Sequence, residues 1–406
     1  MDPVPPSPHH RHQASLEDII LLSDEPEPLD AVQRGRAEQK FYHIVRHFEA
    51  AEGGTRSNSN SNSNSNSSQY NRPLLVRLTY EYARSRESQD IFLRALFHSL
   101  ALSLNDQDDV DLDRNQEQLR AALSLFADYL FDNFFFPLRA SSGKTPQLSP
   151  LVHSAIQRAQ GGEVREFLGT PERIASLRGE CLVRDRHRCV ISRQFDLDEA
   201  KRRFKADGSN ALDDDGDPLM TADSKFAHLE VAHILPHSLT KMGSEADGSQ
   251  SLPPSKKAAL DILNMFDKGV AHFIEGNDID RPRNAITLTQ QHHTSFGCFD
   301  IFFEPVPGQG AHTYQIRSFL PPLFIQDIPV VRTLFLTENR SIEPPSARFL
   351  ALHRAIAHIL HLSGAGDYAQ KILRDREWKD TREDGSTELG YLVALRLGER
   401  SSAVHT

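Results

Sequence analysis

The 406-residue sequence is poor in cysteine, in tryptophan and in long apolar runs. Its three cysteines, Cys181, Cys189 and Cys298, form no Cys-x-x-Cys pair, so neither a zinc-finger-like site nor a secreted disulfide framework is expected. No run of about 18 apolar residues and no signal-peptide core is present, which argues against a membrane-spanning segment. With a mean hydropathy of −0.48, the sequence predicts a soluble intracellular protein with no membrane partner, in either the nucleus or the cytoplasm.

A net positive charge is also lacking, because 56 Asp and Glu outnumber 46 Lys and Arg and the formal net charge is −10. This net charge argues against a protein that binds nucleic acid over most of its surface. The charge is uneven: residues 1–30 hold seven acidic side chains against one Arg, whereas residues 173–205 hold ten Lys or Arg against five Asp or Glu. The basic stretch is compatible with phosphate contacts and equally with a solvated surface that includes Lys201, Arg202 and Arg203 on a helix.

Composition along the chain predicts five regions. Low-complexity Ser/Asn repeats cannot pack and indicate a flexible linker, while apolar residues at helical spacing predict helices on both sides of it. A polar, Pro-containing stretch after the second helical part marks the best domain boundary. The expected regions are a disordered, acidic, Pro-rich tail at 1–30, a helical region at 31–140 with the linker at 57–68, a second linker at 141–176, a central domain at 177–305, and an α+β extension at 306–406.

Three short segments of the central domain carry the chemistry. In order they are Arg188-Cys189-Val190-Ile191-Ser192, Glu230-Val231-Ala232-His233-Ile234-Leu235-Pro236, and Asn284 through His293. Together they supply a His, an Asn and a second His, which is the residue set of a one-metal phosphodiester hydrolase. Such an enzyme needs a base to deprotonate water and a cation to neutralise charge on the leaving oxygen.

Each of the three residues suits one task. His233 ends an alternating run that stops at Pro236, so it is expected at a strand end, where its near-neutral pKa suits a base. Asn284 begins a short apolar run and can hold the ring of the base or lend its amide oxygen to a hard cation. His293 is expected on a helix, where a neutral imidazole can bind a metal. Its neighbour His292 points about 100° away, so only one of the two can face the metal.

These residues resemble the HNH endonucleases, whose ββα-metal motif is named for the three positions. The resemblance rests on Cys189-Val190-Ile191-Ser192, on Ala232-His233-Ile234-Leu235-Pro236, and on Asn284 with Leu288, His293 and Phe296 behind it. The phrases Leu263-Asn264-Met265-Phe266-Asp267 and Ile279-Asp280-Arg281-Pro282 are similar to those of uncharacterised fungal proteins that carry this domain. The resemblance covers about 177–305 and implies an α+β fold, with a ββα-metal core, flanking helical segments and disordered low-complexity N-terminal parts.

The resemblance implies that His233 is the general base, Asn284 its orienting or metal-side partner, and His293 a metal ligand. Many family members place a second ligand immediately before the catalytic His, where this chain has Ala232. The substitute would be Glu230 or His237, and strand alternation predicts that Glu230 needs a bulge to reach the site. The usual turn Gly is Arg193, which suits a left-handed turn poorly. The 51 positions from His233 to Asn284 require an insertion, in which Ser255 to Met265 is expected to be helical.

The sequence therefore predicts a metal-dependent HNH endonuclease that hydrolyses phosphodiester bonds of DNA. His233 and Asn284 are the expected catalytic residues, and His293 with Glu230 the expected ligands of one divalent ion, which could be Mg, Mn, Ni or Zn. The alternative is a catalytically inactive module of the same fold that binds nucleic acid or protein, because Ala232 leaves the metal shell incomplete. Nothing in the sequence identifies a protein partner.

Overall fold

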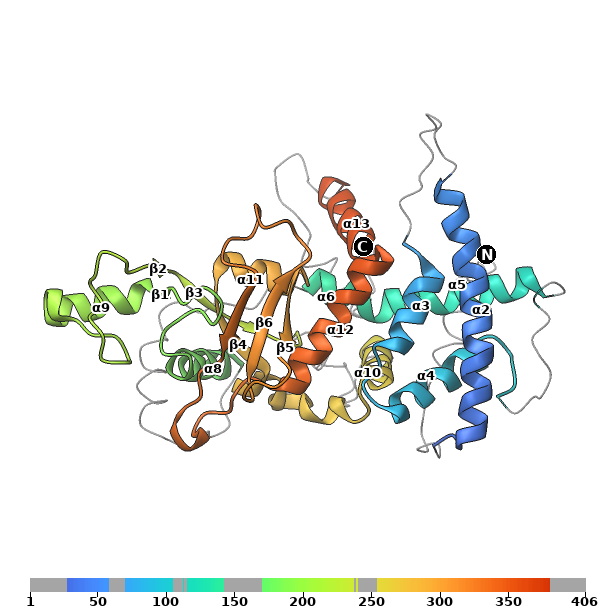
Figure 1. Cartoon of the computed structure of the whole chain (residues 1–406), viewed down its shortest axis with the longest axis horizontal. Coiled ribbons are helices and arrows are strands. Elements are labelled where there is room, and N and C mark those ends of the chain that lie inside the picture. The colour runs from blue at the N-terminus through green and yellow to red at the C-terminus, as the bar shows by residue number, and fades with distance from the viewer. Residues whose placement is uncertain are drawn as a thin grey trace, which may run out of the picture. The chain divides into compact units, whose positions relative to one another are not determined.

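The structure, a computed structural model, describes residues 28–57, 70–104, 112, 115–141, 170–236, 239 and 254–379 (Figure 1). It mixes helices with small sheets, which confirms the α+β class predicted from the sequence. The tail expected at 1–30 and the linkers expected at 57–68 and 141–176 lie largely outside the described residues. No described helix is long and apolar enough to cross a membrane.

The chain forms two compact units. Unit 1 comprises Met1–Ala140, Met242–Phe273 and His358–Thr406, and unit 2 comprises Ser141–Lys241 and Ile274–Ala357. Unit 1 therefore consists of three stretches of chain and unit 2 of two. This division into two units does not test the domain boundaries expected from the sequence, which remain predictions.

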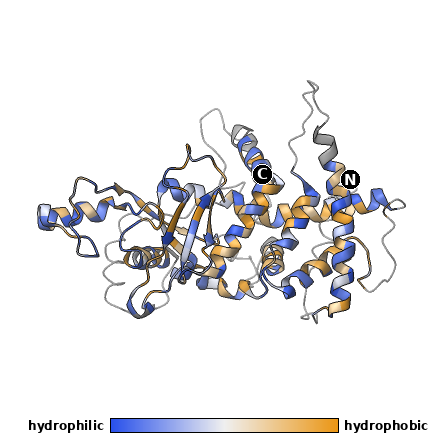
Figure 2. Ribbon diagram, viewed as in Figure 1, coloured by the Kyte–Doolittle hydropathy of each residue, from blue (hydrophilic) through white to orange (hydrophobic). Residues whose placement is uncertain are grey.

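Unit 1 is helical in its described part. Hydrophobic and hydrophilic residues alternate along its helices, as Figure 2 shows, so each helix has an apolar face to bury. Its elements are α2 (Ala31–Ser57), α3 (Arg72–Glu81), α4 (Arg86–Ser99), α5 (Gln116–Leu130), the π-helical turn η1 (Phe131–Phe135), α6 (Phe136–Ser141), α10 (Pro254–Phe266), the 3₁₀ turn η4 (Val270–Phe273), the end of α12 (Ala347–Ser363) and α13 (Ala365–Lys379).

Aromatic rings fill the core of unit 1. The ring of Phe41 in α2 lies 4.7 Å from Tyr80 in α3 and 5.9 Å from Phe92 in α4, and Phe92 lies 5.7 Å from Phe126 in α5. Edge-to-face and tilted ring pairs of this kind add to the free energy gained from apolar burial. One set of contacts thus joins four helices that are separated along the chain.

Helix α10 confirms the helix expected in the insertion between His233 and Asn284. It belongs to unit 1, where Phe266 stacks on Phe134 of η1 with ring centroids 5.5 Å apart. The backbone carbonyl of Phe266 also accepts a 2.7 Å hydrogen bond from the amide of Arg84. The insertion is therefore part of the helical core of unit 1.

Unit 2 is built from short strands and the helices beside them. A parallel pair joins β1 to β2, an antiparallel pair joins β3 to β4, and an antiparallel sheet has the order β5-β6-β7. The elements are α8 (Thr170–Arg184), β1 (Phe195–Asp196), α9 (Leu197–Asp207), η2 (Gly208–Asn210), β2 (Phe226–Ala227), β3 (Leu229–His233), η5 (Gly276–Asp280), η6 (Pro282–Asn284), β4 (Ala285–Thr289), α11 (Gln290–Gly297), β5 (Ile301–Pro305), β6 (Thr313–Ser318), β7 (Val330–Thr333), η7 (Glu338–Arg340) and the start of α12.

A buried ion pair organises unit 2 around β4. Arg184 and Asp185 are both solvent-excluded, and two guanidinium nitrogens of Arg184 lie 2.8 Å from the two carboxylate oxygens of Asp185. Arg184 also donates to the carbonyls of Pro282 at 2.7 Å and Ala285 at 2.9 Å, while Asp185 accepts the amide of Thr287 at 3.1 Å. The end of α8 thus fixes the backbone on both sides of Asn284.

A buried histidine of α12 supports α11. The imidazole of His353 stacks on the ring of Phe296 with centroids 3.9 Å apart, and its Nε2 lies 3.0 Å from the Phe296 carbonyl oxygen. Phe299 stacks against the same imidazole at 4.7 Å. Burial lowers the pKa of His353 to about 3, against the opposing effect of that hydrogen bond.

Replacing Arg184 with Met should destabilise unit 2 by about 3–5 kcal/mol, because Asp185 would be left as an uncompensated buried charge. Urea denaturation followed by circular dichroism gives the free energy of unfolding, and hydrogen exchange localises the loss to β3 and β4. The matched control is Arg317→Met, since Arg317 is exposed and pairs with Glu304; it should cost at most about 1 kcal/mol. Equal stability of the two variants would contradict the central role of Arg184.

His353 should make the protein less stable as the pH falls below about 6.5. The pKa is about 3 in the folded state against an ordinary value of 6.5, so the unfolded chain binds the proton first between these values. The loss of stability due to His353 is absent above pH 6.5 and complete near pH 3. His353→Phe keeps a stacked ring without a titrating group, and its melting temperature, compared with the wild type from pH 7 to 5, should fall less steeply. Parallel curves would show that His353 does not carry this dependence.

Candidate functional site

The site residues gather on one hairpin and the helix that follows it. Strands β3 and β4 pair in an unbroken register from Leu229 opposite Thr289 to His233 opposite Ala285. Thr289 then caps α11, its hydroxyl oxygen accepting the amide of His292 at 3.3 Å. The strand-strand-helix order expected for residues 229–297 is therefore present.

Alternation along β3 separates its side chains onto two faces. Val231 and Ala285 form a buried cluster with Leu177 and Cys181 of α8. His233 lies opposite Ala285 in the register, so its side chain belongs to this α8 face. Glu230 and Ala232 alternate with these residues and lie on the other face, where α11 packs.

On the α8 face, His233 lies against a buried carboxylate. Its Nε2 is 3.1 Å from Oδ1 of Asp280, and the two side chains are only 3% and 1% exposed. Oδ2 of Asp280 lies 3.4 Å from Nε of Arg173, so the carboxylate also has a cationic neighbour. An imidazole held by a carboxylate through one nitrogen keeps a defined tautomer, with the basic lone pair on the other nitrogen.

Asp280 is a site residue to which the sequence alone assigned no role. The signal was its place in the phrase Ile279-Asp280-Arg281-Pro282, which carried part of the family resemblance. A role could not be read from that phrase, because Asp280 is 47 positions from His233 and reaches it only through the turn η5.

Asn284 shapes the backbone after His233. Its Oδ1 accepts the amide of Leu235 at 2.9 Å, and its Nδ2 donates to the carbonyls of Leu235 and Ile279, both at 3.0 Å. The side chain is fully buried. Asn284 thus binds the chain on both sides of the pair formed by His233 and Asp280, whereas the sequence suggested a bond to the ring or to a metal.

On the α11 face, Glu230 and His293 meet. Oε2 of Glu230 lies 2.5 Å from Nδ1 of His293, with side-chain exposures of 23% and 6%. Strand alternation placed Glu230 on the face opposite His233, as expected; the register of β3 has no bulge, so Glu230 reaches His293 of α11 and not the side of His233. The structure therefore brings the two expected ligands together, on the face opposite His233.

His292 is engaged elsewhere. Its Nδ1 lies 3.0 Å from the Thr289 hydroxyl and 3.7 Å from Sγ of Cys189. Burial raises the pKa of the Cys189 thiol, but the hydrogen bond and charge of His292 outweigh burial, and the net shift is downward. His292 thus fastens the Cys189 turn to α11, while His293 faces Glu230.

Glu230 and His293 offer one carboxylate and one imidazole on a partly exposed face. Among the described residues no group of three or more His, Cys, Asp or Glu side chains could hold a metal. An imidazole suits Ni or Zn, whereas Mg prefers oxygen ligands, and the 2.5 Å bond between the two side chains would have to open for both to bind one ion. Ala232 shares their face without a donor atom, and His237, the other proposed ligand, lies outside the described residues.

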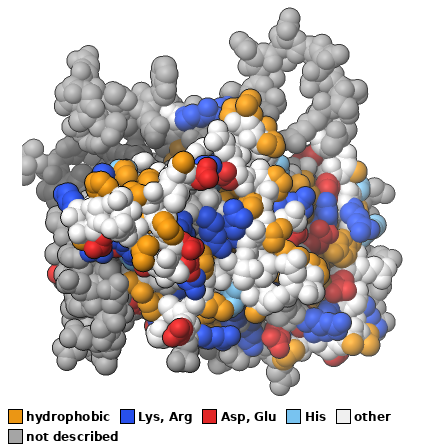
Figure 3. All heavy atoms as spheres, turned by 60° about the vertical axis from the view of Figure 1, so that its left-hand side comes forward, with side chains coloured by type: hydrophobic (Ala, Val, Ile, Leu, Met, Phe, Trp, Pro, Cys, Tyr) orange, Lys and Arg blue, Asp and Glu red, His pale blue; other side chains and the backbone are white. Residues whose placement is uncertain are grey.

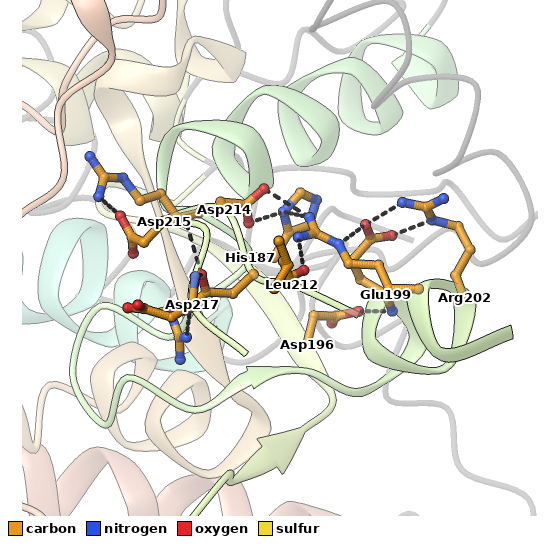
Figure 4. Close-up of polar contacts among 12 residues, drawn as sticks. His187, Asp196, Glu199, Arg202, Leu212, Asp214, Asp215 and Asp217 are labelled. Atoms are coloured by element: carbon orange, nitrogen blue, oxygen red, sulfur yellow. Dashed lines mark hydrogen bonds and ion pairs between the residues drawn. The ribbon is translucent and has the colours of Figure 1, made fainter. Parts of the chain in front are cut away.

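The basic stretch is largely compensated by an acidic loop, as Figure 4 shows. Asp214 lies 2.9 Å from Nδ1 of His187 and accepts from Arg203 at 2.8 Å, and Asp215 pairs with Arg186. Further pairs join Arg188 to Asp213 and both Arg202 and Arg203 to Glu199. Acidic and basic side chains are accordingly interspersed on the face shown in Figure 3. These ion pairs account for the acidic loop without a bound cation.

Comparison with known proteins gives one match. Residues 189–304 match a family model described as HNH endonuclease. No curated protein and no solved structure matches the chain. The matched stretch contains β3, β4 and α11, and with them His233, Glu230, Asn284, His293 and Asp280.

Asn284→Ala should destabilise the loop after His233 by roughly 2–4 kcal/mol, because it leaves buried backbone groups of Leu235 and Ile279 unpaired. Hydrogen exchange of peptides covering 229–236 measures the effect directly. Asn264 offers a control, since its Oδ1 accepts only the partly buried amide of Gly269, and Asn264→Ala should leave these peptides protected. If Asn284→Ala also left them protected, the positioning role would be refuted.

Proposed function

Because residues 189–304 belong to the HNH endonuclease family, we propose that this protein is a metal-dependent endonuclease that hydrolyses phosphodiester bonds of DNA. The observation that carries the proposal is the hydrogen bond between His233 and buried Asp280 at the end of β3. The narrower resemblance to uncharacterised fungal proteins stays a prediction.

In this proposal His233 is the general base and Asp280 its positioning residue. With Nε2 directed at Asp280, Nδ1 takes a proton from water as the water oxygen bonds to phosphorus, and the leaving sugar oxygen takes a proton from solvent as its bond to phosphorus breaks. Asp280 favours the imidazolium that results, as a carboxylate does beside a catalytic histidine. The products are one phosphomonoester end and one hydroxyl end.

Asn284, Glu230 and His293 complete the proposed site. Asn284 positions the backbone after His233 through its bonds to Leu235. Glu230 and His293 would hold one divalent ion, which supplies positive charge for the phosphate oxygens when bound. The identity of the ion, among Mg, Mn, Ni and Zn, is left to experiment.

A second candidate is a docking module of the same fold that binds nucleic acid or protein without cleaving it. Two observations favour it. The side chain of His233 is only 3% exposed, and it lies on the face opposite Glu230 and His293. Ala232 also offers no ligand beside His233.

Cleavage of supercoiled plasmid by purified full-length protein, with magnesium, manganese, nickel or zinc, tests the proposal. The wild type should nick DNA only with metal, and His233→Ala should abolish nicking. Asp280→Asn should slow it by roughly 10²–10⁴-fold, in the range of a lost acid–base contribution. His228→Ala is the matched control, because His228 is 64% exposed just before β3, and it should cleave like the wild type.

Two further measurements make the result decisive. Glu230→Gln and His293→Ala should raise the metal concentration needed for half-maximal nicking by at least about 10-fold, if they are ligands. Circular dichroism must show that each variant is folded; if His233→Ala unfolds, His233→Asn takes its place. Folded wild type that binds DNA but cleaves it with none of the metals would overturn the enzyme proposal in favour of the docking module.

A further inference from the structure

Arg193 and Arg332 of unit 2 each donate a hydrogen bond to the segment that carries the other. Arg193 lies in the turn after Cys189, and its Nη2 donates to the carbonyl of Thr333 in β7 at 2.6 Å. Arg332, the residue before Thr333, donates through Nε to the carbonyl of Ile191 at 2.7 Å. The two reciprocal bonds bring both guanidinium groups to one place between the turn and β7.

Neither of these guanidinium groups has a carboxylate within ion-pair distance among the described residues. Their neighbours differ in this respect, since Arg186 pairs with Asp215 and Arg188 with Asp213. The guanidinium of Arg193 lies over the ring of Phe335, with its central carbon 4.1 Å from the centroid. The negative charge that acts most strongly on Arg193 is that of Asp185, which is already paired with Arg184. The two guanidinium groups are therefore less well neutralised than Arg186 and Arg188.

Arg193 also has three features that are unfavourable in the protein alone. Its backbone has a φ of +64°, which strains a residue other than glycine. Its Nη1 is buried without a hydrogen-bond partner among the described residues. Burial and, after it, the charge of Arg332 lower the pKa of Arg193 to about 10. A bound anion would offset the last of these, the lowered pKa.

We infer that Arg193 and Arg332 form a binding site for a backbone phosphate of DNA, separate from the residues proposed to hydrolyse it. Guanidinium groups bind phosphate oxygens through paired, charge-assisted hydrogen bonds. The inference deepens the proposed function and rests on it for the choice of DNA.

The position of the pair relative to the hairpin supports this assignment. The turn that carries Arg193 is fastened to β4 by a 2.9 Å bond from the amide of Val190 to the carbonyl of Thr287. It also contacts α11, because Sγ of Cys189 lies 3.7 Å from His292, next to His293. A DNA strand at the hairpin could thus engage the arginine pair through another of its phosphates.

The test measures DNA affinity without cleavage. A fluorescent 20-base-pair duplex is titrated with full-length protein in EDTA at several salt concentrations. Each lost phosphate contact should reduce the slope of log affinity against log salt by about 1, and because both arginines bind the same phosphate, the double variant R193Q/R332Q should lose about 1. Arg317→Gln is the matched control, because Arg317 lies on the neighbouring strand β6 and pairs with Glu304; its slope should equal that of the wild type.

Arg193→Gly separates binding from folding. Glycine suits a φ of +64°, so the turn should keep its backbone conformation although the bond to Thr333 and the contact with Phe335 are lost. Circular dichroism should show a folded variant whose salt slope is lower than that of the wild type, by at most about 1. A folded variant with the slope of the wild type would show that the role of Arg193 is purely structural and would overturn the inference.

The remaining outcomes are also distinguishable. A changed slope in a protein that cleaves with no metal would keep the phosphate site and reject the nuclease proposal. Normal metal-dependent cleavage by the wild type, with an unchanged salt slope in R193Q/R332Q, would keep the nuclease proposal and reject the phosphate site. Inorganic phosphate provides the last arm: if it raises the melting temperature of the wild type but not of R193Q/R332Q, while the DNA slope is unaffected, the site binds free phosphate and the assignment to DNA is wrong.

Discussion

The buried pair of Arg184 and Asp185 is the interaction on which the hairpin depends. A charge in the protein interior is tolerated only when it is paired and its remaining hydrogen-bonding groups are satisfied. Here the guanidinium uses the Pro282 and Ala285 carbonyls, and the carboxylate uses the Thr287 amide. Satisfying the pair therefore fixes the chain that leads into β4. Asn284 lies between Pro282 and Ala285, whose carbonyls both bind Arg184, so the backbone that carries the Asn284 side chain is fixed.

A second constraint follows from strand alternation. With β4 fixed, the register of β3 leaves no freedom over which side chains face α8 and which face α11. His233 is thereby directed to Asp280, and Glu230 to His293. The hairpin thus holds the pair of His233 and Asp280 on one face and the pair of Glu230 and His293 on the other. Each pair is built from one residue of β3 and one residue that is distant in the chain.

Much of this arrangement could be predicted from the sequence, but not all of it. The α+β class, the family and the helix at 254–266 could be predicted because they depend on local pattern and on short motifs. The partner of His233 could not, since Asp280 reaches it through a turn whose path no periodicity reveals. Alternation predicted correctly that Glu230 lies on the face opposite His233, but it could not predict that α11 brings His293 to that face. The roles of His233, Asn284, His293 and Glu230 stay predictions.

The passage of the chain through unit 1 between β3 and β4 has a consequence for folding order. The paired strands β3 and β4 of unit 2 are joined by a stretch that includes α10, whose residue Phe266 packs in the core of unit 1. Unit 2 is thus a discontinuous domain, and its hairpin closes a loop much longer than an ordinary turn. Such closure loses more chain entropy and is slower than local pairing. Formation of the helical core would shorten that loop in effect, so the two units are expected to fold in a coupled order, helices first.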